Sequence, residues 1–287
     1  HEILHAIVQE FSVDNQDGIR NPVGMYGTKL EARVRIVTGA ITCIQNVIRS
    51  VQRAGLPFGG LILQALAAEK AVLTPEEREL GVVCLDIGGG TTDLAVITGR
   101  SLRHTAVITL GGNNITKDIS FGLRIPFHSA EDIKRSAGCC LASEVGEQEI
   151  VEIPASAGRQ PRAVPRRAVV RIIEPRIEEI LEQVRDELRT ANCPEESLGG
   201  GLVLTGGCAA LPHVVGKAEQ VFERLSARVG EPARPANAPE ALSRPEFAVA
   251  VGLLHEAAEQ RRHAGARRRP PLLGGVSRWF QKLLKES

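Results

Sequence analysis

One stretch decides the predicted fold: residues 84–96, with the sequence CLDIGGGTTDLAV. Its pattern predicts a buried strand that ends near Leu85, a turn of three glycines, and a second strand that begins at Leu94. Glycines expose the backbone N–H groups, so a phosphate can approach them more closely than it could approach residues with a Cβ. A hairpin with a glycine-rich turn is the alternative, but it explains neither the acid before the glycines nor the hydroxyls after them. The stretch therefore predicts a phosphate-binding loop.

The polar residues of this loop have the chemistry of a nucleotide site. Asp86 follows the first strand and is suited to hold Mg²⁺ through water, because Mg²⁺ keeps several waters and takes only one or two carboxylates. Thr91 and Thr92 carry hydroxyls that can donate to phosphate oxygens. No Gly-Lys-Ser/Thr follows, and the next element is a strand rather than a helix. The loop is therefore neither a Walker loop nor a dinucleotide-binding fingerprint.

A second glycine cluster, residues 199–212, has the sequence GGGLVLTGGCAALP. It predicts a strand that runs directly into a glycine turn and then a helix. Ligands bind to α/β sheets at such strand ends. The small residues of the turn would let a flat ring lie against the backbone. Slim, alanine-rich helices are predicted at 64–73 and 244–254, so two units of the chain repeat one plan.

The rest of the chain shows strand and helix patterns without catalytic chemistry. Residues 1–56 predict a small α/β interaction module. Beyond it, the patterns predict a strand at 60–63, a solvated loop at 75–79, strands at 94–98, 101–110 and 148–153, a loop at 154–165, and helices at 115–123 and 166–190. Pro175 is expected to kink the last helix or to mark its true beginning.

Two features near the middle of the chain leave alternatives open. Gly111 and Gly112 form either a helix-start turn or a further phosphate contact. Ser129 is predicted as a helix N-cap. Glu131 and Lys134 then share one face of that helix, where a surface ion pair is the alternative to a functional pair.

Composition excludes several classes of protein. With 287 residues, 43% of them hydrophobic, the chain can bury a sizeable core. Aromatic residues make up only 3%, so the stacking platforms of a single-strand nucleic-acid binder are missing. Six cysteines without a C-x-x-C pair predict buried, reduced thiols, with redox activity of Cys139 and Cys140 as the alternative. Neither a signal peptide nor a transmembrane run is recognisable. The chain begins in mid-pattern at His1, which suggests an N-terminal truncation.

The order of these motifs resembles the actin-like ATPase superfamily, which includes sugar kinases, heat-shock chaperones and bacterial filaments. Within it the chain is similar to the FtsA family of bacterial cell-division proteins over nearly its whole length. The segments that carry the resemblance are HEILHAIVQEFSVD, GIRNPVGMYGTKLEARVRIVTG, VVCLDIGGGTTDLAVITG, LRHTAVITLGGNNITKDI, LVLTGGCAALPHV and FAVAVGLLH.

The resemblance implies an α/β fold of the actin-like (ribonuclease H-like) ATPase type. Two sheet-and-helix halves, a small inserted α/β subdomain and a C-terminal amphipathic helix are expected. The implied domains are the inserted interaction subdomain at 1–56, the incomplete remainder of the first half at 57–80, the second half at 81–260, a basic linker at 261–273, and a membrane-targeting helix at 274–287.

The resemblance also implies a site for ATP and Mg²⁺. Asp86 matches the Mg²⁺-associated acid, and Gln64 falls where the family keeps a residue that positions the attacking water. A glutamine orients water but is a poor base, so hydrolysis is expected to be slow. The other implied nucleotide contacts are Gly88, Gly89, Gly90, Thr91 and Thr92 in the phosphate loop, Glu131 and Lys134 in an E-x-x-K pair, and Gly206, Gly207, Ala210 and Leu211 in the adenosine loop.

The last residues of the chain predict a membrane contact. Residues 261–287 hold eight Lys or Arg against one acid, whereas the rest of the chain is mildly acidic. Helical spacing places apolar residues on one face and basic residues on the other, as in helices that lie flat in an anionic lipid interface. A terminal helix docked on the protein's own core is the alternative. The predicted membrane residues are Val276, Arg278, Trp279, Phe280, Lys282, Leu283, Leu284 and Lys285.

FtsA-like function would combine these parts. The resemblance implies an ATP-binding nucleotide switch, at most a slow ATPase. It would polymerise with itself on the cytoplasmic face of the inner membrane at the division site, tether the FtsZ ring there, and recruit later division proteins through the inserted subdomain. No nucleic-acid partner is implied. The family's first phosphate loop is not found, so we expect this chain alone to bind ATP weakly. A pilus-assembly adaptor and a metabolic kinase on the same fold are the rival interpretations.

Overall fold

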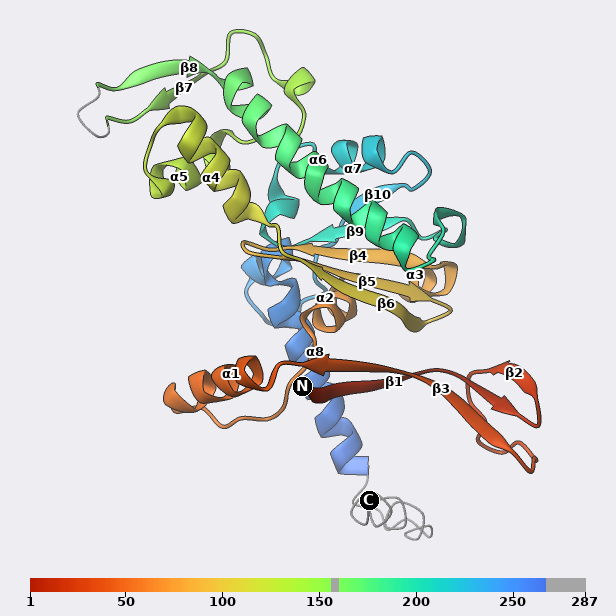
Figure 1. Ribbon diagram of the computed structural model, residues 1–287. Helices are drawn as coiled ribbons and strands as arrows, with labels where there is room; N and C mark the ends of the chain where they lie inside the picture. Colours follow the sequence, from red (N-terminus) through yellow and green to blue (C-terminus); the bar gives the residue numbers. More distant parts are fainter. Residues whose placement is uncertain (156–159, 267–287) are drawn as a thin grey trace.

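The computed structural model describes residues 1–155 and 160–266, and they form a mixed α/β structure around one five-stranded sheet (Figure 1). The strand order is β10-β9-β4-β5-β6, and β4 runs parallel to β9 but antiparallel to β5. The strands are β4 (Val82–Ile87), β5 (Thr92–Thr98), β6 (Ser101–Ile108), β9 (Leu202–Thr205) and β10 (Ala227–Val229). Every residue of β4 is buried, as expected of a central strand covered on both faces.

Helices cover both faces of this sheet (Figure 1). On one face α6 (Arg166–Thr190) and α7 (Val214–Val221) share a core with Val83 and Leu85 of β4. On the other face α2 (Gln64–Val72) and α8 (Ala248–Ala266) share a smaller core with Val82 and Cys84. The alternating side chains of β4 therefore supply both cores. Helix α6 runs through Pro175 without ending, so the expectation that the helix begins there was wrong.

The two helices on the second face lie very close together. A Cβ added to Gly252 of α8 would lie 1.8 Å from the carbonyl oxygen of Ala67 in α2. Lys70 of α2 pairs with both Glu256 and Glu259 of α8, at 2.6 Å in each case. The prediction that small residues keep these helices slim is confirmed by this backbone contact.

The far end of α6 carries a separate group of elements (Figure 1). They are α4 (Gly112–Leu123), α5 (Phe127–Ala137) and the hairpin of β7 (Ile150–Ile153) and β8 (Arg162–Pro165). Part of the predicted loop at 154–165 is therefore a strand. Helix α5 begins before Ser129, so that residue is not its N-cap. Pro126 takes the N-cap position instead, where its fixed φ suits entry into a helix.

The N-terminal residues fold as predicted into a small α/β unit. Its sheet has the order β2-β1-β3, built from β1 (Glu2–Val13), β2 (Gln16–Ile19) and β3 (Leu30–Gly39), and α1 (Ile41–Arg53) follows. Ile7 packs against the core shared by α2 and α8. The N–H of Leu63, just before α2, donates to Nε2 of His5 at 3.0 Å.

Two sequence-based predictions in the next segment were wrong. Residues 60–63 form no strand and pair with none in the described chain; the N–H of Leu63 donates to the His5 side chain instead of to a strand backbone. Residues 75–79 belong to a short helix, α3 (Pro75–Leu80), rather than a loop. Thr74 and Glu77 form a reciprocal capping box at its start, and Pro75 occupies the first turn. Within the described residues, no helix has the length and hydropathy needed to cross a membrane.

Candidate functional site

Four strands of the central sheet end at the same edge, and three of them, β4, β6 and β9, lead into the loops of one site. β4 and β9 are parallel, and β6 is antiparallel to β5 and so runs with them. Their carboxyl ends lead into the glycine loop after Ile87, the start of α4, and the turn at Gly206. This convergence brings together the two glycine clusters, although they lie more than a hundred residues apart in the sequence.

A cavity of about 450 Å³ lies between these loops and α5. Segment 244–246 completes its wall, and the N–H of Gly206 holds it there by donating to the carbonyl of Pro245 at 3.2 Å. Seven of the residues predicted from the sequence line the cavity: Gly88, Gly89, Glu131, Lys134, Gly207, Ala210 and Leu211. The lining residues that the sequence did not indicate include Asn113, Arg135, Cys208, Arg244 and Glu246.

The glycine loop is closed and supported by backbone hydrogen bonds. The N–H of Gly88 donates to Thr91 O at 2.9 Å. At the start of α4, the N–H groups of Gly112 and Asn113 donate to Gly88 O at 2.9 Å and Gly89 O at 2.7 Å. The N–H of Gly111 donates to Oδ1 of Asn114 at 3.1 Å. Residues 111–112 are thus a helix start whose N–H donors are already engaged within the protein, so these donors are not free for a further phosphate contact, although Gly112 lines the cavity.

The remaining amides of this loop fit a phosphate. Within the described part of the chain, the N–H groups of Gly89, Gly90 and Thr91 have no acceptor. A Cβ added at Gly90 would meet nothing within 4 Å, so open space lies beside the loop. Successive unengaged amides beside open space are the usual cradle for a phosphate group.

Two carboxylates lie beside the loop. Asp86 is 4% exposed, and its Oδ2 accepts a 2.9 Å hydrogen bond from Nε2 of Gln64. Burial raises the pKa of Asp86, and the hydrogen bond from Gln64 partly offsets this. Asp93 lies opposite Asp86 on β5. Its pKa is also raised by burial, opposed by a 2.9 Å hydrogen bond from the Thr91 hydroxyl.

Asp93 is the acid that sequence reasoning missed. The sequence does contain a signal for it. Asp93 directly follows the two threonines, and in a hairpin around the glycine turn it pairs with Asp86, so both side chains lie on the same face of the sheet. Among the described residues, no group of three or more His, Cys, Asp or Glu side chains is arranged to hold a metal. Two carboxylates fit Mg²⁺, which retains most of its water shell.

The Thr92 side chain does not lie in the cavity. It is fully buried in β5 and its hydroxyl donates to Leu110 O at 2.9 Å. The prediction that this hydroxyl binds phosphate was wrong, because β5 begins at Thr92 and buries the side chain, and the single hydroxyl hydrogen is used by Leu110 O. Thr91 stays outside the strand beside the loop.

Glu131 and Lys134 form a pair on α5, 2.7 Å apart, and the pair is not a surface one. Lys134 is only 8% exposed. Burial raises the pKa of Glu131, but hydrogen bonds from Lys134 and Thr116 outweigh burial and leave this pKa below its ordinary value. Glu131 is therefore ionised at neutral pH at the wall of the cavity.

The second glycine turn has two different glycines. Gly206 has φ +84°, and a Cβ there would lie 2.3 Å from Oδ1 of Asp86. Gly207 has no such strain, and a Cβ there would meet nothing within 4 Å. Gly206 thus lets the turn approach the carboxylate closely, whereas Gly207 leaves one side of the cavity open.

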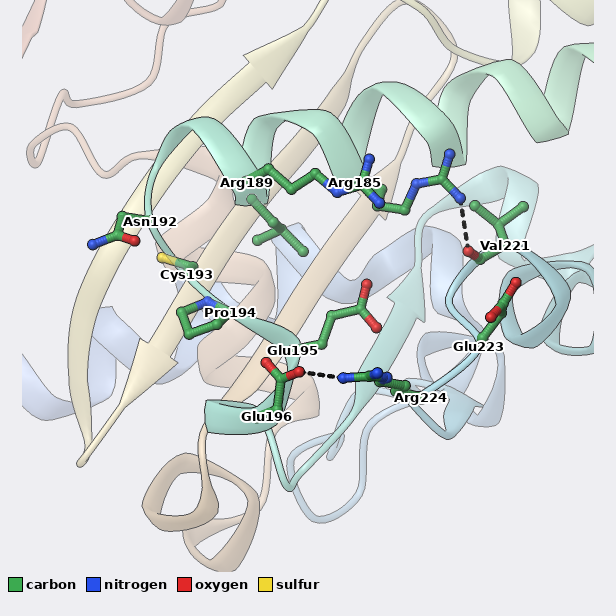
Figure 2. Close-up of a pocket in the computed structure, with 11 residues that line it drawn as sticks. Arg185, Arg189, Asn192, Cys193, Pro194, Glu195, Glu196, Val221, Glu223 and Arg224 are labelled. Atoms are coloured by element: carbon green, nitrogen blue, oxygen red, sulfur yellow. Dashed lines mark hydrogen bonds and ion pairs between the residues drawn. The ribbon is translucent and has the colours of Figure 1, made fainter.

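A second cavity, of about 520 Å³, lies at the opposite edge of the sheet, before β9 and β10 begin (Figure 2). Arg185 and Arg189 of α6 extend over it, and Arg224 pairs with Glu196 across it. None of the residues predicted to bind ligand lines it. The predicted membrane residues, 276–285, lie outside the described part of the chain.

Comparison with known proteins identifies the family. The family model described as cell division protein FtsA matches residues 83–252, and that of the SHS2 domain inserted in FtsA matches residues 1–38. The chain is 43% identical over 256 residues to cell division protein FtsA of Neisseria meningitidis serogroup B, covering 89% of this chain and 62% of that protein. It is 39% identical over 290 residues to FtsA of Escherichia coli K12, covering 99% of this chain and 69% of that protein.

A solved structure supports the fold. The crystal structure of MreB5 of Spiroplasma citri bound to ADP matches with a TM-score of 0.63 at 17% identity, covering 89% of this chain and 90% of that one. At this identity the likeness shows the fold alone. Taken with the two family matches and the identities to relatives, the actin-like architecture shows that this chain belongs to the FtsA family of cell-division proteins.

Proposed function

We propose that the cavity at the carboxyl edge of the sheet binds ATP and Mg²⁺, and that ATP acts as the nucleotide switch of a division protein. The observation that carries the proposal is the convergence of both glycine clusters and the Glu131–Lys134 pair on one cavity of about 450 Å³. MreB5 of Spiroplasma citri, which has the same fold, has been solved bound to ADP and bound to AMPPNP. The two glycine clusters lie on different sides of the cavity, so one can bind the phosphates of a nucleotide and the other its adenosine.

Each wall of the cavity suits one part of the ligand. The free amides of Gly89 and Gly90 donate hydrogen bonds to phosphate oxygens. Asp86 and Asp93 accept hydrogen bonds from the water molecules that Mg²⁺ would keep. The open side at Gly207 and Ala210 receives the adenine ring. Glu131, which is ionised and whose side chain is 33% exposed, accepts hydrogen bonds from the ribose.

Hydrolysis at this site is slow. Gln64 donates to Asp86 and is itself exposed at the start of α2, so it can orient a water beside the phosphates. An amide cannot take up the proton, and orientation alone gives a modest acceleration. Slow turnover suits a switch, because the bound nucleotide then persists long enough to define a state.

Filling the open side of the cavity tests the nucleotide proposal. Gly207→Val places a side chain in free space without backbone strain, whereas Gly59→Ala does the same at a loop outside the site. ATP binding is followed by saturation-transfer NMR on this chain at millimolar nucleotide, which detects weak complexes. Wild type and Gly59→Ala are expected to give a signal that EDTA reduces, and Gly207→Val to give none. Equal signals from all three proteins would contradict the proposal.

We further propose that the protein acts at the division site on the cytoplasmic face of the inner membrane. There it polymerises with itself, links the FtsZ ring to the lipid through residues 274–287, and recruits later division proteins through residues 1–56. Family membership supports the division role, and the basic, apolar composition of the tail supports the membrane contact. Linked copies strengthen a weak anchor through effective concentration.

Liposome binding tests the membrane part of this proposal separately. The wild-type chain is expected to pellet with vesicles containing anionic lipid and to stay in solution with neutral vesicles. Trp279→Glu is expected to remain in solution with both. Pelleting of FtsZ with these vesicles only when the wild-type chain is present would support the tether. Equal pelleting of wild type and Trp279→Glu would contradict the membrane contact.

A further inference from the structure

The hydrogen bonds of Lys134 show that its ammonium is fully engaged by the protein. Nζ lies 2.7 Å from Glu131 Oε2, 2.9 Å from Thr116 Oγ1 and 3.1 Å from Gly112 O. An ammonium carries three N–H donors and no acceptor. All three donors therefore have partners within the cavity wall, and none is left for a bound molecule.

Thr116 lies at the centre of this network. It is fully buried on α4, fifteen residues before Glu131. Its Oγ1 lies 2.5 Å from Glu131 Oε2 and 2.9 Å from Gly112 O, while it accepts the bond from Lys134. A hydroxyl has one hydrogen, so it donates to one of these two oxygens at a time. In either case it holds Lys134 beside Glu131.

The two oxygens of Glu131 differ as a result. Oε2 is held by Lys134 and Thr116, which come from two different helices. Oε1 has no partner within the described part of the chain. One oxygen thus fixes the carboxylate and the other keeps its capacity to accept hydrogen bonds in the cavity, where Glu131 is part of the lining.

We propose that the two members of the E-x-x-K pair have separate roles. Glu131 contacts the ligand through Oε1, while Lys134 and Thr116 are positioning residues that orient Glu131 and make no contact with the ligand themselves. This inference rests on the proposed ATP site, and the ligand groups that Oε1 recognises are then the ribose hydroxyls. Thr116 therefore determines how strongly the site discriminates ATP from an analogue that lacks those hydroxyls.

The test compares ATP with 2′,3′-dideoxy-ATP in matched variants. Thr116→Val removes the hydroxyl at nearly constant volume, and Thr116→Ser keeps it. Affinities for both nucleotides are measured on the same sample by ligand-observed NMR titration. The ratio of the two affinities is unaffected by any loss of folded protein. The same ratio is measured in Glu131→Ala and in the double variant of Glu131→Ala and Thr116→Val.

Wild type and Thr116→Ser are expected to prefer ATP by about tenfold, which corresponds to one hydrogen bond to a charged group. Thr116→Val is expected to lose most of this preference through weaker ATP binding, with dideoxy-ATP affinity unchanged. In the Glu131→Ala background, Thr116→Val is expected to have no further effect on the ratio.

Three outcomes would overturn these roles. An unchanged ratio in Thr116→Val would contradict the inference, including the case in which both affinities fall by the same factor. If wild type binds ATP but shows no preference over dideoxy-ATP, the inference also fails while the proposed function stands. If wild type binds neither nucleotide, the proposed function fails and the inference falls with it.

Discussion

Nε2 of Gln64 and Oδ2 of Asp86 are 2.9 Å apart, so the first residue of α2 is hydrogen-bonded to the carboxyl end of β4. Gln64 is exposed, whereas Asp86 is only 4% exposed. It supplies the only side-chain donor to Asp86 among the described residues. Helix α2, which packs closely against α8, is thereby hydrogen-bonded to the proposed phosphate site.

Replacing Gln64 by Met keeps the length of the side chain and removes its amide. The pKa of Asp86, already raised by burial, should rise further, because its ionised form loses a hydrogen bond. We expect the free energy of unfolding to fall by about 1.5–3 kcal/mol at neutral pH. The difference should disappear as the pH falls and Asp86 is protonated in both proteins. Urea unfolding at several pH values measures this, and a loss independent of pH would point to packing instead.

The two glycines of the second turn should respond differently to alanine. Gly206→Ala places a Cβ against Asp86 at a φ of +84°, so we expect a loss of stability of at least about 1–3 kcal/mol. Gly207→Ala meets open space and should change stability by less than about 0.5 kcal/mol. Urea unfolding of the two variants side by side provides the comparison. Equal midpoints would show that the turn relaxes to accept a side chain.

Glu69 should make stability depend on pH. This α2 residue is 8% exposed, and burial raises its pKa from 4.5 to about 7, although Arg78 lies 2.5 Å away. The folded state therefore binds a proton more tightly than the unfolded state does. Stability from this group is present below pH 4.5 and is lost as the pH rises through 7, by about 3 kcal/mol in total.

Glu69→Gln removes this titration and is the control. The variant should gain stability relative to wild type between about pH 5 and pH 8, as measured by urea unfolding. A constant difference between the two proteins across this range would show that the ion pair with Arg78 keeps Glu69 ionised.

The close contact between α2 and α8 should not tolerate a larger residue. Gly252→Ala would bring a Cβ within 1.8 Å of the Ala67 carbonyl, so the helices must separate. Overpacking of this kind costs about 1–3 kcal/mol. Leu253→Ala, at a 45% exposed position next to it, is the control and should have a smaller effect. Thermal melting of both variants measures the difference, and equal melting temperatures would contradict the packing argument.

Four of the five central strands, β4, β5, β6 and β9, could be predicted from the sequence, because β4 and β9 are apolar runs that end at glycine clusters and β5 and β6 follow the first cluster. β10 was missed, because its three residues, Ala227–Val229, carry no strand pattern of their own. Helix α3 was missed although its signal was present in Thr74, Pro75 and Glu77. The strand expected at 60–63 failed for the opposite reason: its apolar run is real, but pairing depends on a neighbour that local sequence does not show. β8 was missed for a similar reason: it is a strand because its backbone pairs with β7, and its own sequence does not show that partner.

The loops that form the candidate site could be predicted from the sequence, but the hydrogen bonds between its side chains could not. Glycines and acids beside strands indicate the phosphate loop, whereas Thr116 is fifteen residues from Glu131 and on another helix. No spacing rule connects them. The same holds for Thr92, whose hydroxyl donates to Leu110 O, eighteen residues away, on the buried side of β5.

The two amides of α4 that donate to Gly88 and Gly89 have a consequence for the cost of binding. Any change in the glycine loop that moved those carbonyls would leave helix donors without acceptors, so these hydrogen bonds hold the loop in one shape. A ligand that fits this shape loses little conformational entropy from the protein when it binds. Affinity at this end of the cavity is therefore set by preorganisation, and the loop serves as a fixed template.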